Sequence, residues 1–324
     1  MITTSFIKRS AAIFLLISTL LLTMCSCSEK VASDTGSEAE FVEFTDALGR
    51  NVSVKKKPER AAALIGSFAD VWLLSGGTLC AAAEDAWQDF GFESDTAINI
   101  GGAHSPNVEL LLSAAPEFVI ASASTASNIE LLDVLSQSGI TVAYFDVDSF
   151  EDYLKMLDIC TDITGRKDLY EKNGISVSEK ISDIKNRFNE SSLQSAQKTV
   201  LLLRASSGKV KAKGSSGTIL GELLYDMGCV NIADSENSIL ENLSLEAIIE
   251  NDPYNIFIVT MGNDEDAAKR SFIKMTEENP AWQELSAIRD NRVYFMEKSL
   301  FNLKPNARWA ESYEKLFEIL TKQT

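Results

Sequence analysis

The sequence of 324 residues contains a single histidine, His104. Zinc and manganese sites commonly take several ligands from histidine, so a site of that kind is excluded and we predict no metal site. His104 stands in the stretch GGAHSPN, which we interpret as a loop. Ligation of a haem iron by His104 is the weaker alternative.

The motifs of two enzyme classes are also missing. The chain has no G-x-x-x-x-G-K-[ST] loop, so it is not a P-loop ATPase. It has no G-x-S-x-G nucleophile elbow either, and one histidine leaves little capacity for base catalysis. We therefore predict a binding protein without catalytic residues or a cofactor, and an exported α/β hydrolase is the minor alternative.

Basic residues are few, since 30 Lys and Arg stand against 47 Asp and Glu, and the formal net charge is −17. An acidic protein repels nucleic acid and anionic membrane surfaces, so we predict no nucleic-acid partner. Apolar residues make up 45% of the chain, which is enough for a packed core.

No apolar run is long enough for a comfortable transmembrane helix. The longest near the N-terminus, AAIFLLISTLLLTM, has 14 residues and follows Lys8 and Arg9, a pattern typical of a secretory signal. The next residues, CSCSEK, resemble a bacterial lipoprotein signal, in which the lipid-bearing cysteine follows small residues. Cys27 fits this pattern better than Cys25, which is the alternative site of lipidation.

These features predict a lipoprotein signal peptide over residues 1–26 and a flexible, polar tether over 27–42. The folded body is then lipid-anchored at the extracytoplasmic face of a bacterial cell membrane, without spanning it. An ordinary cleaved signal peptide remains the other interpretation. Three cysteines follow this segment without disulfide or metal spacing, and we expect them in the core: Cys80, Cys160 and Cys229.

The body alternates strand and helix patterns, which predicts α/β architecture with parallel sheets. Residues 41–60 read as a hairpin, and short apolar strands alternate with helices up to residue 148. A long amphipathic pattern over 166–190, interrupted only by Gly174, predicts one helix that joins two lobes. We predict an N-terminal lobe over 43–148, a helical connection over 149–192 and a C-terminal lobe over 193–324.

One phrase occurs in both lobes. Glu109 precedes Pro116 by seven positions, Glu246 precedes Pro253 by seven, and an apolar run follows each proline. Taken alone, each glutamate is a carboxylate in the first turn of a helix, where the helix dipole favours it.

Several phrases together resemble the solute-binding proteins of ABC importers for iron(III)-siderophores, haem and vitamin B12. They are FTDALGRNVSV, VELLLSAAPEFVIAS, LYDMGCVNIAD, LSLEAIIENDPYNIFIV and NPAWQELSAIRDNRVYFME, in this order over about residues 43–322. The resemblance implies two Rossmann-like lobes joined by one rigid helix, with the ligand in the cleft between them. It also implies that Glu109 and Glu246 dock on the permease dimer of an importer driven by a separate ATPase, and that the protein works as a monomer.

The ligand of a parallel α/β sheet lies beyond the carboxyl ends of its strands. In this acidic chain, residues 204–216 and 298–309 contain basic residues and no acid, which suits an anionic, oxygen-rich ligand. Aromatic residues could cover its apolar parts. The predicted ligand-binding residues are Phe68, Trp87, Arg204, Lys213, Phe301, Lys304 and Arg308.

A metal chelate, and above all an iron(III)-siderophore, is therefore the predicted ligand. Cobalamin and haem remain alternative ligands, and the class of siderophore, hydroxamate or catecholate, stays open. Structural interpretations compete for some of these residues. The stretch GKVKAKG also reads as a solvated hairpin turn, Trp309 as a core residue, and Phe68 as a residue packed beneath its loop.

Overall fold

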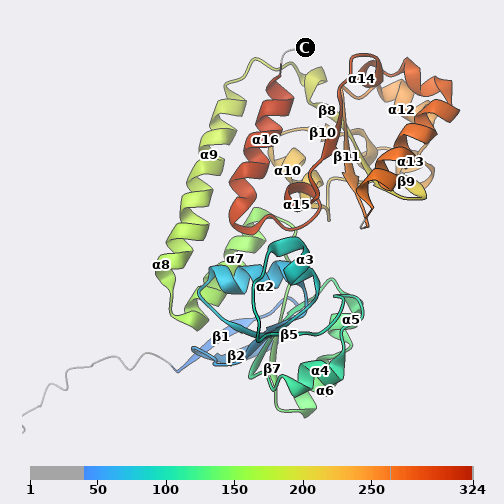
Figure 1. Cartoon of the computed structure of the whole chain (residues 1–324). Helices are drawn as coiled ribbons and strands as arrows, with labels where there is room; N and C mark the ends of the chain where they lie inside the picture. The colour runs from blue at the N-terminus through green and yellow to red at the C-terminus, as the bar shows by residue number, and fades with distance from the viewer. Residues whose placement is uncertain (1–39, 263, 323–324) are drawn as a thin grey trace, which may run out of the picture. The chain divides into compact units, whose positions relative to one another are not determined.

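The computed structural model describes residues 40–262 and 264–322, and its first element is an antiparallel hairpin (Figure 1). β1 (Phe41–Thr45) pairs with β2 (Asn51–Lys55). In the connecting turn, one carboxylate oxygen of Asp46 accepts hydrogen bonds from the backbone N–H groups of Leu48 and Arg50, at 3.0 Å each. The hairpin predicted for residues 41–60 is confirmed.

A five-stranded parallel sheet follows, with the strand order β5-β4-β3-β6-β7. Its strands are β3 (Ala61–Ala63), β4 (Leu79–Ala82), β5 (Ile98–Asn99), β6 (Phe118–Ser122) and β7 (Thr141–Phe145). The helices between them are α2 (Gly66–Leu74), α3 (Asp85–Phe90), α4 (Val108–Ser113), α5 (Ala126–Ile129) and α6 (Leu132–Gln137). Helices on both faces bury the central strands completely, which explains why they read as unbroken apolar runs.

Helices then carry the chain to the second sheet: α7 (Phe150–Thr164), α8 (Lys167–Tyr170), a π-helical turn (Glu171–Ile175) and α9 (Ser176–Asn189). The long helix predicted for 166–190 is confirmed as a helical path, with the π turn around Gly174. A Cβ atom on Gly174 would lie 3.0 Å from Leu154 and 3.3 Å from Leu157, so glycine permits close packing against α7. Tyr153 of α7 donates a hydrogen bond to the Asn173 carbonyl at 2.9 Å, which satisfies one backbone group of the π turn.

A capping box fixes the start of α7. Ser149 accepts from the Asp152 backbone N–H, and Asp152 accepts from that of Ser149, at 3.2 Å each. Ser149→Ala should lower the free energy of unfolding by about 1 kcal/mol, because it leaves an N–H group at the helix start without a partner. Urea unfolding of both proteins measures the difference, and an unchanged midpoint would contradict this role of Ser149.

The second sheet has the strand order β10-β8-β11-β12, with β9 paired antiparallel to β8. Its strands are β8 (Thr199–Ser206), β9 (Lys209–Ala212), β10 (Val230–Asn231), β11 (Asn255–Thr260) and β12 (Val293–Met296). Its helices are α10 (Ile219–Asp226), α11 (Asn237–Asn242), α12 (Leu245–Asn251), α13 (Glu265–Glu278), α14 (Ser286–Arg289), α15 (Lys298–Phe301) and α16 (Trp309–Thr321). Short 3₁₀ turns lie at Ser195–Lys198, Ile232–Asp234, Pro280–Glu284 and Asn306–Arg308.

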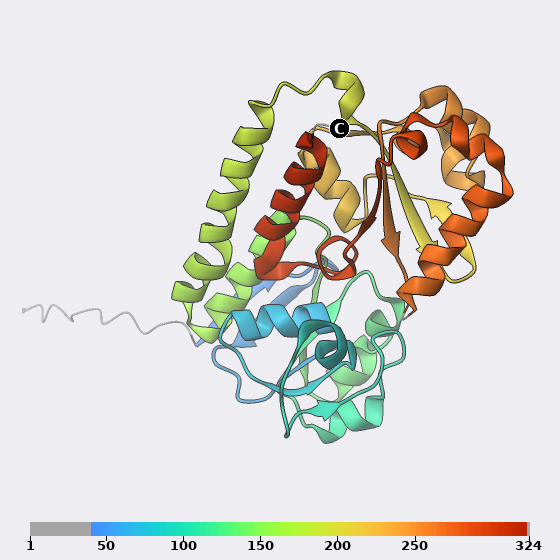
Figure 2. The same cartoon turned by 45° about the horizontal axis from the view of Figure 1, so that its top comes forward.

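We call the part built on β1–β7 the N-terminal lobe and the part built on β8–β12 with α16 the C-terminal lobe. The predicted fold class, α/β with two parallel sheets joined by a long helix, is confirmed. α16 lies beside α9 in both views (Figure 1, Figure 2), where Arg187 of α9 forms an ion pair with Glu314 of α16 at 2.6 Å.

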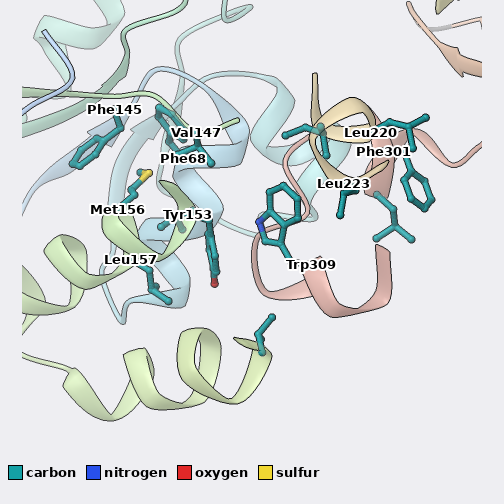
Figure 3. Close-up of a cluster of buried hydrophobic side chains, with 14 of the residues drawn as sticks. Phe68, Phe145, Val147, Tyr153, Met156, Leu157, Leu220, Leu223, Phe301 and Trp309 are labelled. Atoms are coloured by element: carbon teal, nitrogen blue, oxygen red, sulfur yellow. The ribbon is translucent and has the colours of Figure 1, made fainter. Parts of the chain in front are cut away.

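The lobes share one hydrophobic cluster in addition to the cluster each has of its own. Figure 3 shows part of the shared cluster, with Phe68 and Tyr153 from the N-terminal part and Leu223 and Trp309 from the C-terminal lobe. Trp309 is 1% exposed, so its interpretation as a core residue is confirmed.

Some local predictions need correction. Phe68, expected to pack beneath a loop, lies instead in the first turn of α2, because this helix begins three residues after β3 ends. The stretch GKVKAKG is not a simple turn but contains β9, whose residues Val210 and Ala212 pack on the core of the C-terminal lobe.

Candidate functional site

Arg204 lies near the carboxyl end of β8, on a face fixed by the alternation of that strand. Val200 and Leu202 of the same face belong to the cluster shared by the lobes, whereas Leu201 and Leu203 pack into the separate cluster of the C-terminal lobe. Arg204 is partly buried, and its Nε is buried without a hydrogen-bond partner. Burial lowers the pKa of this guanidinium below its usual value.

Two lysines join Arg204 on this face. Lys211 of β9 pairs directly with Arg204, and Lys213, two residues on, donates its backbone N–H to the Leu202 carbonyl at 2.9 Å. Burial lowers the pKa of Lys213, and the positive charges of Arg204 and Lys211 lower it further. We call Arg204, Lys211 and Lys213 the basic face.

The basic face has no acid to neutralise it. Within residues 40–262 and 264–322, no ion pair joins Arg204, Lys211 or Lys213 to a carboxylate. An unpaired, partly buried guanidinium is unfavourable unless a further group satisfies it. The arrangement can therefore receive the oxygen atoms of an anion.

The other two predicted cations differ from the basic face, because carboxylates bind one and affect the pKa of the other. Arg308 is exposed and binds both carboxylate oxygens of Glu311, at 2.8 and 3.1 Å, and lies 3.5 Å from Glu297. Burial lowers the pKa of Lys304, and the negative charge of Asp148 offsets this only in part. Residues 298–309 contain no acid, but Asp89 of α3 and Glu297 lie within ion-pair distance of Lys298 and Arg308. The prediction of an isolated positive charge in this segment is therefore wrong.

The predicted aromatic residues differ in how far they are exposed to a ligand. Phe68 is 0% and Phe301 2% exposed, and both belong to the shared cluster, so neither offers a surface to a ligand in this structure. Lys304 lies over the Phe68 ring at 6.0 Å. Trp87 of α3 is only partly buried and packs on Phe92 with ring centroids 4.9 Å apart, so it remains an aromatic candidate from the N-terminal lobe.

Sequence reasoning missed the contacts that join the lobes beside these residues. Lys298 of α15 forms an ion pair with Asp89 of α3 at 3.1 Å. Asn306 donates to the Ser67 carbonyl and to Asp70, at 2.8 Å each. No local sequence pattern predicts such pairs, because their members are more than 200 positions apart in the chain.

Glu109 and Glu246 occupy matching positions in the two lobes. Each is the second residue of its helix, α4 or α12, and each is exposed. The helix starts are capped by other side chains, since Asn107 accepts from the Leu110 N–H at 3.0 Å and Ser244 from the Ala247 N–H at 3.4 Å. The glutamates are therefore not needed as N-caps.

The end of each phrase is alike too. Ala115 (φ 45°) and Asp252 (φ 34°) adopt a left-handed conformation after the helix, a proline follows, and then comes a fully buried strand, β6 or β11. A helix that turns directly into a strand runs opposite to it. Each glutamate therefore lies toward the carboxyl edge of its sheet, where ligands of this architecture bind.

A groove of about 670 Å³ lies elsewhere, between α7, α9, α10 and α16, and its lining does not include Arg204, Lys213 or Trp87. The candidate site therefore rests on the charge and burial of its side chains. His104 is exposed in its loop. In the part of the chain that the structure describes, no group of three or more His, Cys, Asp or Glu side chains is arranged to hold a metal ion.

The signal peptide, both candidate lipidation sites, Cys25 and Cys27, and nearly all of the tether lie outside the described residues. Of the remaining cysteines, Cys160 and Cys229 are buried and Cys80 is partly buried. The helices from residue 40 onward include none with the length and apolar character that crossing a bilayer requires.

Comparisons with known proteins agree with this architecture. Residues 62–300 match the family model described as "Periplasmic binding protein". The iron-uptake system-binding protein of Bacillus subtilis is 25% identical over 298 residues, which cover 88% of this chain and 90% of the relative.

Two solved structures have the same fold. Staphylococcus aureus SirA complexed with staphyloferrin B aligns with a TM-score of 0.65 and 19% identity, over 86% of this chain and 97% of SirA. S. aureus IsdE complexed with heme aligns with a TM-score of 0.65 and 18% identity, over 81% of this chain and 99% of IsdE.

Proposed function

Because the chain belongs to the periplasmic binding protein family, we propose that it captures an iron(III)-siderophore outside the cytoplasmic membrane and delivers it to an ABC permease. The lipoprotein-like signal supports a lipid-anchored protein at the extracytoplasmic face of the membrane. The protein itself binds and presents the ligand, and a separate ATPase drives uptake.

The basic face is the observation that carries this proposal. A chain with a net charge of −17 places Arg204, Lys211 and Lys213 together near the carboxyl end of β8, without acidic partners in the described residues. Guanidinium and ammonium groups bind carboxylate, catecholate and hydroxamate oxygens through charge-assisted hydrogen bonds. A ferric siderophore presents such oxygens around the metal, so the protein needs no metal ligand of its own.

The relatives support the same class of ligand. The B. subtilis relative is named for iron uptake, and the SirA structure contains staphyloferrin B. The IsdE structure contains heme, which keeps haem as an alternative ligand. The uncompensated cations disfavour cobalamin, which carries little negative charge to match the basic face.

Titration of the purified protein tests the proposal. A ferric hydroxamate, a ferric catecholate, a ferric carboxylate siderophore, cyanocobalamin and haemin should be compared by calorimetry and tryptophan fluorescence, with the iron-free siderophores as controls. We expect micromolar or tighter binding of at least one ferric siderophore. Binding of haemin or cobalamin alone would support the alternative ligand, and binding of none would refute the metal-chelate proposal.

A further inference from the structure

Asn306 connects the lobes through an amide with an incomplete set of hydrogen bonds. It is 1% exposed, lies in the 3₁₀ turn before α16, and has a left-handed backbone with φ 52°. Its Nδ2 donates both protons to the N-terminal lobe, one to the Ser67 carbonyl and one to Asp70 Oδ2, at 2.8 Å each. Its Oδ1 is buried and has no hydrogen-bond donor.

The orientation of this amide is fixed by its neighbours. The Ser67 carbonyl can only accept a hydrogen bond, so the amide nitrogen must face it. Rotating the amide by half a turn would set two carbonyl oxygens against each other. The unsatisfied Oδ1 therefore follows from the surroundings of Asn306, and a buried acceptor without a donor is costly.

Asp70 of α2 has no cation to hold its charge. Within the described residues it forms no ion pair, and Asn306 is its recorded side-chain partner. Burial raises the pKa of Asp70, and the hydrogen bond from Asn306 offsets this only in part.

The neighbouring charged and titratable groups do not change this description. Tyr153 of α7 donates its hydroxyl proton to the Asn173 carbonyl, so that proton is not available to Asp70. Burial lowers the pKa of Lys304, and the negative charges of Asp148, Asp146 and Asp152 offset this only in part. Burial raises the pKa of Tyr153, and the negative charge of Asp70 raises it further.

We propose that Asp70 and Asn306 form a carboxylic acid–amide pair that is completed when Asp70 takes up a proton. The carboxyl donates that proton to Asn306 Oδ1, while Asn306 Nδ2 continues to donate to Asp70 Oδ2. Protonation thus supplies the missing donor and neutralises a partly buried carboxylate in one step. The pair is a pH-sensitive contact that joins α2 of the N-terminal lobe to the 3₁₀ turn that precedes α16.

The direction of the pH effect follows from the raised pKa of Asp70. Folding favours the protonated form, so the stabilisation is fully present below the ordinary aspartate value of 3.8 and is lost as pH rises through the raised pKa. Other carboxylates give the opposite trend, because an acid that is ion-paired in the folded protein stabilises it at higher pH. The test must therefore be a difference between proteins that differ only at Asp70.

The experiment is urea unfolding of the wild type and Asp70→Asn over a series from about pH 3 to pH 8. The new amide reproduces both hydrogen bonds of the pair without titrating. The unfolding constants should match at the acid end, and that of the wild type should become severalfold larger at the alkaline end. A difference that does not change with pH, or one with the opposite sign, would overturn the pair.

A second variant keeps the proposal testable if Asp70→Asn fails to fold. Asp70→Ala removes the carboxyl without supplying an amide, so the wild type should be more stable at low pH and lose that advantage as pH rises. Asp89→Asn is the matched control, because it removes the carboxylate that binds Lys298 across the same junction and should destabilise the protein at neutral pH. These measurements need no ligand, so they are independent of the proposed function.

Discussion

Replacing both Glu109 and Glu246 with glutamine should abolish uptake and leave chelate affinity unchanged. Both side chains are exposed at helix starts, in matching places of the two lobes. In the docking mode that the family resemblance implies, each carboxylate contacts the permease dimer, and glutamine keeps the shape of the side chain but removes its charge. Truncating one member of a desolvated charge pair costs about 2–5 kcal/mol, so losing two should prevent productive docking.

Two measurements separate docking from ligand capture. Uptake of radioactive iron by cells reports transport, and calorimetry with the purified variant reports affinity. Glu130→Gln with Glu250→Gln is the matched control, because these exposed glutamates lie outside the first turns of α4 and α12 and should leave uptake normal. A loss of chelate affinity in the Glu109 and Glu246 variant would instead place the two carboxylates in the ligand site.

Arg204→Gln should weaken chelate binding by about 10- to 100-fold, since a hydrogen bond to a charged group contributes about 1.5–3 kcal/mol and 1.4 kcal/mol is tenfold in affinity. The free protein should lose little stability, because Arg204 Nε has no partner and burial already disfavours the charged form. Calorimetric titration measures the change in Kd, and thermal unfolding checks the fold.

Arg308→Gln is the matched control for Arg204→Gln. The two arginines were equivalent candidates in the sequence, but Arg308 is exposed and bound by Glu311. Its replacement should change the Kd less than twofold. Equal losses in both variants would mean that long-range charge, and not the basic face, determines affinity.

Much of the architecture was predictable because it depends on local patterns. Alternation gave the hairpin, and buried apolar runs gave the strands. The resemblance to solute-binding proteins of ABC importers is confirmed by the match to the periplasmic binding protein family and by the similarity to an iron-uptake system-binding protein. β9 escaped prediction because its four residues include two lysines that look like a solvated turn.

The candidate site was only partly predictable, because its electrostatics depend on contacts between distant segments. Arg204 and Lys304 are both cations in segments without acids, yet only the pKa of Lys304 is affected by carboxylates of a distant segment. Phe68 and Trp87 both follow strands of the first sheet, but the first lies on the inner face of α2 and the second near the surface on α3. The roles proposed for these residues and for Glu109 and Glu246 stay predictions until the variants are measured.

The helical path from α7 to α9 also makes the molecule separable. Each sheet uses one uninterrupted stretch of chain, residues 61–145 or 199–296, so the polypeptide passes between the sheets only once. A cut in the exposed residues after α9 would leave two fragments, each with a complete sheet and each carrying part of the shared hydrophobic cluster. Such fragments could be produced separately and tested for reassembly.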